Sequence, residues 1–97
     1  MFMKVHRVPG EGDVVAVCDR ELLNQVLRHG DVEVPISDRF YGDRPATDDE
    51  VRGALRGASS INLFGQRTVE LATEMGLVEE AACLLIGGVP HAQVYFI

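Results

Sequence analysis

The chain has 97 residues, enough for one domain with a single hydrophobic core and too few for two. Its 15 acidic and 9 basic residues give a net charge of −6, which argues against direct binding of nucleic acid through bulk electrostatics. The two cysteines, Cys18 and Cys83, lie in apolar surroundings without a CxxC pattern, and the three histidines are scattered. We therefore expect no metal site, no cofactor and no disulfide.

The chain offers no signal for a membrane or for secretion. Its start lacks the apolar core of a secretion signal, and no apolar run approaches the length of a membrane span. We therefore expect a cytoplasmic protein. The acidic balance also suits a salty cytosol, where charge is strongly screened.

The first third of the chain predicts two strands and then a helix. Residues 2–8 and 14–18 read as strands separated by a turn rich in Gly and Pro, and the second strand is apolar at every position, which predicts a central place in a sheet. Apolar residues then recur at helical spacing between Asp19, a good N-cap, and Gly30, a good helix end. This pattern predicts a helix over residues 19–30.

The longest irregular segment covers residues 37–45 and contains two Arg, two Asp and two adjacent aromatics. One interpretation is a binding loop, with Phe40 or Tyr41 as an anchor and Arg39 or Arg44 contacting an anion. The other is that the aromatics fold back on the core as a lid while the charges stay solvated. The sequence leaves both open.

The flanking segments predict a strand and a helix. Residues 31–36 alternate polar and apolar side chains, as a half-buried strand does, and Pro35 indicates either an edge strand or the end of the strand. Thr47 and Glu50 have the spacing of a capping box, so we expect a helix from Thr47 to about Gly57.

Residues 61–64 form either a short buried strand or the start of a helix. We favour the strand because Gly65 would interrupt a helix, and the helical period begins only after it and stops at Gly76. A strand, a Gly turn and a helix with Arg67 near its N-terminus have the geometry of an anion site. A plain connection has the same pattern.

The C-terminal segment predicts a strand, a Gly-Gly loop that can approach another backbone or a ligand closely, and a last strand. In the last strand one face is apolar (Ala92, Val94 and Phe96), and the other aligns hydrogen-bonding groups (His91, Gln93 and Tyr95). His91 could act as a general acid or base, but no nucleophile is spaced to join it, so we assign no catalytic residue. The ligand- or partner-binding candidates are His91, Gln93, Tyr95, Gly87, Gly88, Arg39 and Tyr41, and the anion-binding candidates are Gly65 and Arg67.

Four stretches carry a family resemblance: residues 86–93 (IGGVPHAQ), 14–19 (VVAVCD), 40–42 (FYG) and 61–65 (INLFG). Together they resemble a small archaeal family of unknown function, domain of unknown function 424, and residues 86–93 are the most specific part. The resemblance covers essentially the whole chain. It implies a single-domain archaeal cytosolic protein of about this size without an assigned activity, and it supplies no catalytic residues.

We expect one domain over residues 1–97 with a mixed α/β (α+β) fold, in which three helices pack on one mixed sheet of five or six strands. The expected function is a non-enzymatic binding or interaction module with a protein partner, accessory to RNA-related or translation machinery. One alternative is a small enzyme that acts on a nucleotide or another phosphate-bearing small molecule through His91. A second alternative is a homodimer that pairs its terminal strand edge with its twin.

Overall fold

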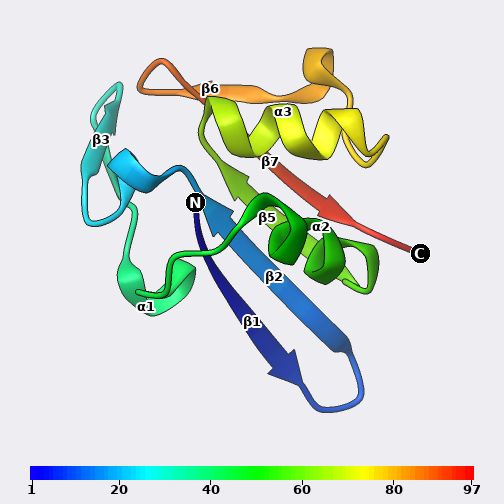
Figure 1. Ribbon diagram of the computed structural model, residues 1–97. Helices are drawn as coiled ribbons and strands as arrows, with labels where there is room; N and C mark the ends of the chain where they lie inside the picture. The colour runs from blue at the N-terminus through cyan, green and yellow to red at the C-terminus, as the bar shows by residue number, and fades with distance from the viewer.

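The computed structural model describes residues 1–97 as a mixed α+β fold with two sheets and three helices (Figure 1). The five-stranded sheet has the order β1-β2-β5-β7-β6, and a separate hairpin pairs β3 with β4. The strands are β1 (Phe2–Val8), β2 (Gly12–Cys18), β3 (Val26–His29), β4 (Val32–Pro35), β5 (Ser60–Phe64), β6 (Leu84–Ile86) and β7 (Val89–Tyr95). The helices are α1 (Asp38–Tyr41), α2 (Asp48–Arg56) and α3 (Gln66–Glu74). The expected fold class is confirmed.

Strand β2 lies inside the sheet, as its unbroken apolar sequence predicts. It pairs antiparallel with β1 and parallel with β5. Val15 and Val17 point to one face of the sheet, where they pack in the larger hydrophobic cluster. Ala16 and Cys18 point to the other face and pack in the smaller cluster.

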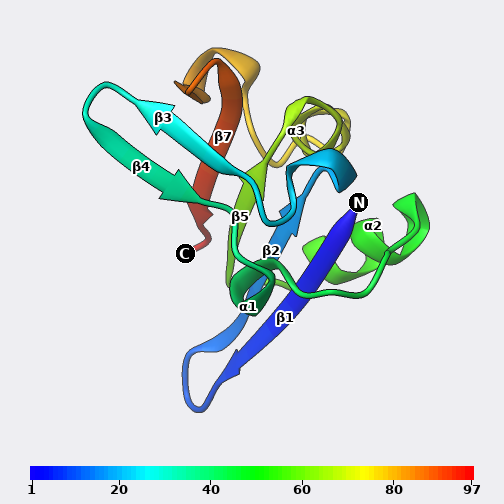
Figure 2. The same cartoon turned by 90° about the vertical axis from the view of Figure 1, so that its left-hand side faces the viewer.

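Different elements cover the two faces of the sheet. Helices α2 and α3 cover one face with apolar side chains, among them Leu55 and Leu71. Helix α1 and the β3–β4 hairpin lie on the other face, where Tyr41 and Ile36 are buried. Figure 2 shows the hairpin on the left of the sheet and helices α2 and α3 on the right. None of the helices has the length and apolar character that a membrane-spanning helix requires.

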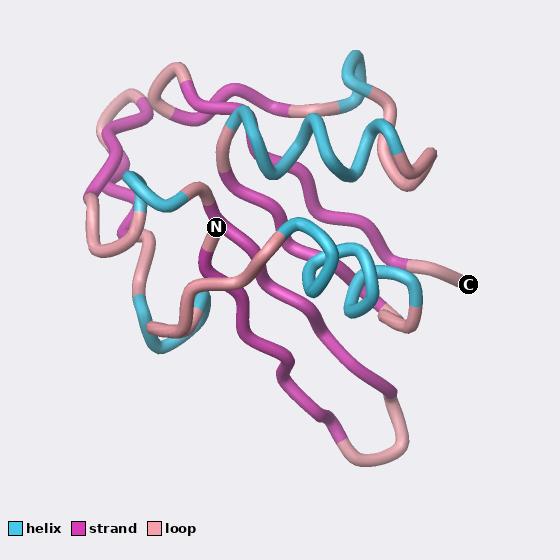
Figure 3. Tube along the Cα trace, viewed as in Figure 1, coloured by secondary structure: helices cyan, strands magenta, loops and turns pink.

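The helix expected over residues 19–30 is absent, and this prediction was wrong. A single 3-10 turn (Arg20–Leu22) is followed by strand β3, as Figure 3 shows. Gly30 does adopt a left-handed conformation, with φ 62°, but it does so in the two-residue turn between β3 and β4. Val26, counted as part of an apolar helix face, is 57% exposed.

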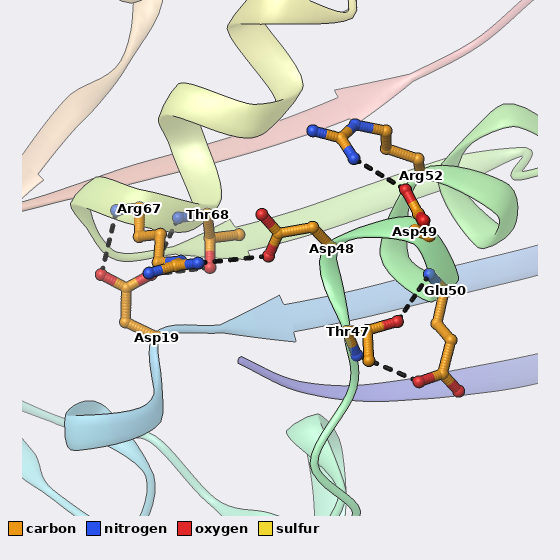
Figure 4. Close-up of polar contacts among 8 residues, drawn as sticks. All are labelled: Asp19, Thr47, Asp48, Asp49, Glu50, Arg52, Arg67 and Thr68. Carbon is orange, nitrogen blue, oxygen red and sulfur yellow. Dashed lines mark hydrogen bonds and ion pairs between the residues drawn. The ribbon is translucent and has the colours of Figure 1, made fainter.

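Helix α1 lies within residues 37–45, which the sequence predicts to be irregular, whereas α2 and α3 lie where their boundary residues predict them. The Thr47 hydroxyl accepts a hydrogen bond from the N–H of Glu50 at 3.2 Å, and the Glu50 carboxylate accepts one from the N–H of Thr47 at 3.1 Å (Figure 4). This capping box opens α2. Residues 61–64 belong to strand β5, and α3 starts directly after Gly65.

Candidate functional site

Strand β7 carries the predicted row of hydrogen-bonding side chains on the sheet face opposite α2 and α3. Its register on β5 places Gln93 beside Asn62 and Tyr95 beside Ser60. Directly opposed residues in an antiparallel pair point to the same face. Gln93 is exposed and Tyr95 is 72% exposed, whereas Ala92 on the other side of the strand is buried.

Helix α1 covers only part of this face. Tyr41 is buried, and its hydroxyl donates a hydrogen bond to Asn62 Oδ1 at 2.6 Å. Phe40 stacks on the His6 ring with the centroids 5.0 Å apart, and His6 Nε2 donates to the Phe40 carbonyl oxygen at 2.8 Å. Helix α1 therefore fixes the amide of Asn62 and leaves the β7 side of the face uncovered.

We call the surface made of His6, Phe40, Asn62, Gln93 and Tyr95 the open face, and its uncovered part is Gln93 and Tyr95. Its members come from β1, α1, β5 and β7, and strands β1 and β7 lie three strand spacings apart, a width of roughly 14 Å. These five residues supply three aromatic or imidazole rings and two side-chain amides, and the Lys4 ammonium lies at the β1 edge of the same face, two residues from His6. The β7 side of this surface can pack against apolar groups and exchange hydrogen bonds without adding a formal charge.

His91 lies on the same side of β7 but is half-buried. Its Nδ1 donates to the Leu63 carbonyl oxygen at 2.9 Å, and its ring centroid is 4.6 Å from that of Phe64. Burial lowers the pKa of His91, and the hydrogen bond to Leu63 opposes that shift in part. The imidazole is therefore neutral at pH 7 and one of its two nitrogens is already used.

Gly87 and Gly88 form the two-residue turn of the β6–β7 hairpin, with φ 57° and 80°. The predicted close approach to another backbone is confirmed. A Cβ added at Gly87 would lie 2.9 Å from the carbonyl oxygen of Arg28 in β3. Gly87 joins the sheet to the β3–β4 hairpin, and neither glycine is part of the open face.

Tyr41 and Arg39, the two binding candidates from residues 37–45, lie in different surroundings. Tyr41 is a core residue, so its ring acts as the lid that the second interpretation describes and is not available as a surface anchor. Arg39 is exposed and lines a shallow hollow near Lys4, beside strand β1. The Arg39 carbonyl oxygen accepts a hydrogen bond from Lys4 Nζ at 3.0 Å. Tyr41 reaches the open face through its hydroxyl, which bonds to Asn62, the cross-strand neighbour of Gln93.

The anion site expected at Gly65 and Arg67 is filled by the chain itself, which corrects that expectation (Figure 4). Asp19 Oδ1 accepts from the N–H and the hydroxyl of Thr68 at 2.8 Å and 2.7 Å, and Oδ2 accepts from the N–H of Arg67 at 3.1 Å. The Arg67 guanidinium points to Asp48, with Nη2 and Oδ1 3.4 Å apart. The Asp19 carboxylate takes the place of the anion at the N-terminus of α3.

Sequence reasoning missed Asn62 and His6. Alternation along the strands could have identified both residues. Asn62 is the polar residue that interrupts the apolar run from Ile61 to Phe64 in β5. His6 lies two positions after Lys4 in β1, so the two side chains share one face of the strand. No group of three or more His, Cys, Asp and Glu residues is placed to hold a metal ion.

Residues 6–97 match the profile of a family described as protein of unknown function, DUF424. The chain is also similar to a solved structure, described as an uncharacterized conserved protein from Methanopyrus kandleri. That similarity has a TM-score of 0.81 and 28% sequence identity, and it covers 97% of this chain and 89% of the other. Among curated proteins, none matches this chain.

Proposed function

The chain belongs to DUF424, a family of unknown function, and from this premise we propose that it is a non-catalytic binding module that holds a partner protein on its open face. The observation that carries the proposal is the uncovered pair Gln93 and Tyr95, aligned beside Asn62 on one sheet face. An exposed tyrosine ring on a rigid sheet loses little conformational freedom on binding.

The chemistry of the open face favours a protein over a nucleic acid. Tyr and Phe are enriched at the centres of protein interfaces, where charged residues are depleted, and the open face shows that composition. A nucleic-acid surface needs clustered Lys and Arg, and the chain has a net charge of −6. The expected link to RNA-related or translation machinery therefore takes the form of a protein partner that belongs to such an assembly.

The enzymatic alternative has weaker support. His91 is packed on Phe64 and bonded to the Leu63 backbone, and no side-chain nucleophile contacts it. A hollow of about 340 Å³ lies between α3 and the β6–β7 hairpin, but its charged lining residues are Glu70, Glu74 and Glu80, and His91 does not reach it. A phosphate-bearing substrate would meet only negative charge there.

The experiment is affinity capture with the tagged wild-type chain and two matched double variants. The test variant is Gln93→Ala with Tyr95→Ala. The control is Val26→Ala with Val32→Ala, which removes two exposed apolar side chains from the β3–β4 hairpin. We expect both variants to keep the free energy of unfolding within about 0.5 kcal/mol per substitution, because these are surface positions.

The test variant should lose the partner that the wild-type chain and the control variant recover. Titration calorimetry with the purified partner should then show at least about a tenfold loss of affinity for the test variant, because aromatic residues at interface centres dominate binding energy. Equal recovery by all three chains would refute the open face as the contact surface. Mass spectrometry of the recovered protein shows whether it belongs to translation machinery.

A further inference from the structure

Strand β7 has a free outer edge along its last residues. Strand β6 pairs with β7 only from Val89 to His91. On the inner side, the N–H of Gly65 donates to the Pro90 carbonyl oxygen at 2.8 Å, and the N–H of Phe96 donates to that of Ser59 at 2.9 Å. Because hydrogen-bonding directions alternate along an antiparallel strand, even-numbered residues of β7 bond to β5 and odd-numbered residues point outward.

The backbone groups of Gln93 and Tyr95 therefore point outward, where no strand pairs with them. Ile97 follows at the same spacing. No loop bond reaches the N–H or C=O groups of Gln93 or Tyr95. Figure 1 shows β7 continuing beyond β6 toward the C-terminus. Unpaired groups of this kind are a template for another strand.

The two ends of the sheet differ in how they are protected. Strand β1, the opposite edge, carries Lys4 and Arg7, is followed by Pro9, and is bridged at Phe2 by Pro45. Charged side chains, Pro and covering segments are the usual means of preventing pairing at an edge. The free stretch of β7 has no charged residue, although the chain as a whole is strongly acidic.

We propose that this edge pairs with the same edge of a second copy of the chain, antiparallel and centred on Tyr95. A twofold axis through the Tyr95 pair sets Gln93 opposite Ile97 of the second copy, and each such pair exchanges both of its backbone hydrogen bonds. This register uses all the outward residues and stops before the stretch of β7 that β6 already occupies.

The composition of the edge favours a second copy over a foreign segment. Tyr95 and Ile97 are both exposed apolar residues, and alternation puts them on one face, so self-pairing sets Tyr95 opposite its equivalent and places Ile97 diagonal to the Tyr95 of the second copy. The paired stretch has no charged side chain, so the side-chain repulsion that opposes association comes from the net charge of −6 on each copy. Salt screens that repulsion, so the dimer strengthens as salt rises, whereas a basic peptide bound to this acidic chain would be released.

This pairing requires no other protein, although it shares Tyr95 with the proposed partner site. It would place the two open faces side by side on one continuous sheet, because Tyr95 belongs to both features. The experiment therefore uses the purified full chain alone, and its outcome leaves the capture result of the proposed function intact.

The test is sedimentation equilibrium of the wild-type chain and of the variants Tyr95→Lys, Tyr95→Glu and Val26→Lys. We expect the wild type and the Val26→Lys control to dimerise, more tightly at higher salt. Each Tyr95 variant should dimerise at least about tenfold more weakly, because like charges then face each other directly. An equimolar mixture of Tyr95→Lys and Tyr95→Glu should restore the dimer, because position 95 faces position 95.

Hydrogen exchange supplies a second readout on the same samples. The amides of Gln93 and Tyr95 should be protected in the wild-type dimer and exchange freely in Tyr95→Lys, while the Phe96 amide, which bonds inward, stays protected in both. A wild-type chain that remains monomeric at every concentration and salt level overturns the proposal. A mixture of the two charged variants that stays monomeric overturns it as well.

Discussion

Two hydrogen bonds join Asp19 to Thr68. Asp19 Oδ1 accepts one from the backbone N–H of Thr68 and one from its hydroxyl. Both residues are buried. The contact links the end of β2 to the start of α3, and the N–H of Asp19 also donates to the Phe64 carbonyl oxygen at 2.9 Å. Parallel strands such as β2 and β5 commonly place a ligand beyond their carboxyl ends. In this chain a carboxylate of its own occupies that crevice.

Replacing Asp19 with Ala should destabilise the fold by about 3 kcal/mol, because two backbone N–H groups and a buried hydroxyl lose a charged acceptor. Thr47→Ala, which removes an exposed cap from α2, should cost about 1 kcal/mol. Chemical denaturation monitored by circular dichroism measures both. Equal losses in the two variants would mean that the buried carboxylate contributes no more than an ordinary cap.

Gly65 should tolerate no side chain, because an added Cβ would clash with the Asp19 carboxylate and the residue has φ 114°. We expect Gly65→Ala to destabilise the protein by more than about 2 kcal/mol. Gly53 in α2 is the matched control, because its added Cβ meets nothing within 4 Å. Gly53→Ala should stabilise the protein by about 0.5–1 kcal/mol, since Ala is the better helix former. Thermal unfolding that ranks the two variants in the opposite order would contradict the packing of Asp19.

Features that depend on residues close together in the sequence were predicted correctly. Features that depend on contacts between residues far apart in the sequence were not. Thr47 and Glu50 lie three residues apart, so their capping box was recognisable in the sequence. Asp19 also has the composition of an N-cap, but it caps a helix that begins 47 residues later, at Gln66. The prediction of a helix over residues 19–30 failed because nothing near Asp19 indicates which helix it serves.

The part of the candidate site that lies on one strand was predictable from the sequence, and the part contributed by other elements was not. Alternation in the last strand places Gln93 and Tyr95 on one face without knowledge of the fold. The neighbours Asn62 and Phe40 depend on the β5–β7 register and on the docking of α1, which the sequence does not encode locally. The Gly87–Gly88 turn was correctly expected to approach another backbone, but its contact, β3, lies in the segment predicted to be helical.

Cys18 should be chemically inert in the folded protein, and Cys83 should react. Burial raises the pKa of the Cys18 thiol from 9.0 to about 12, with a smaller contribution from the neighbouring Asp19 carboxylate. Iodoacetamide followed by mass spectrometry should label Cys83, which is only half-buried, and spare Cys18 until denaturant is added. Labelling of Cys18 under native conditions would mean that strand β2 opens readily.

The raised pKa of the Cys18 thiol also predicts that the folded protein loses stability at alkaline pH. Between pH 9 and about 12 the Cys18 thiol ionises in the unfolded chain but stays protonated in the folded one, so unfolding becomes more favourable as the pH rises. Desolvation also raises the pKa of the buried Tyr41 phenol, which adds to the effect at higher pH. The Cys18→Ala variant should show a smaller decline over this range than the wild type in urea titrations. Parallel declines would argue against a buried thiol.

His91 should make the fold acid-sensitive. Its folded-state pKa lies below the ordinary 6.5 because burial disfavours the imidazolium ion. The unfolded chain therefore binds a proton first as the pH falls below 6.5, and stability declines until the folded-state pKa is passed. Because the Leu63 carbonyl oxygen can only accept, the neutral ring must carry its proton on Nδ1, which nitrogen chemical shifts report.

Two measurements check this expectation for His91. An NMR titration should give the His91 ring a midpoint below 6.5, and the stability of the wild type should fall more steeply in acid than that of His91→Gln, since Gln does not titrate. The other two histidines are present in both chains and cancel from the difference. A midpoint at or above 6.5, with equal acid slopes, would show that water reaches the ring freely and would reopen His91 as a proton-transfer group.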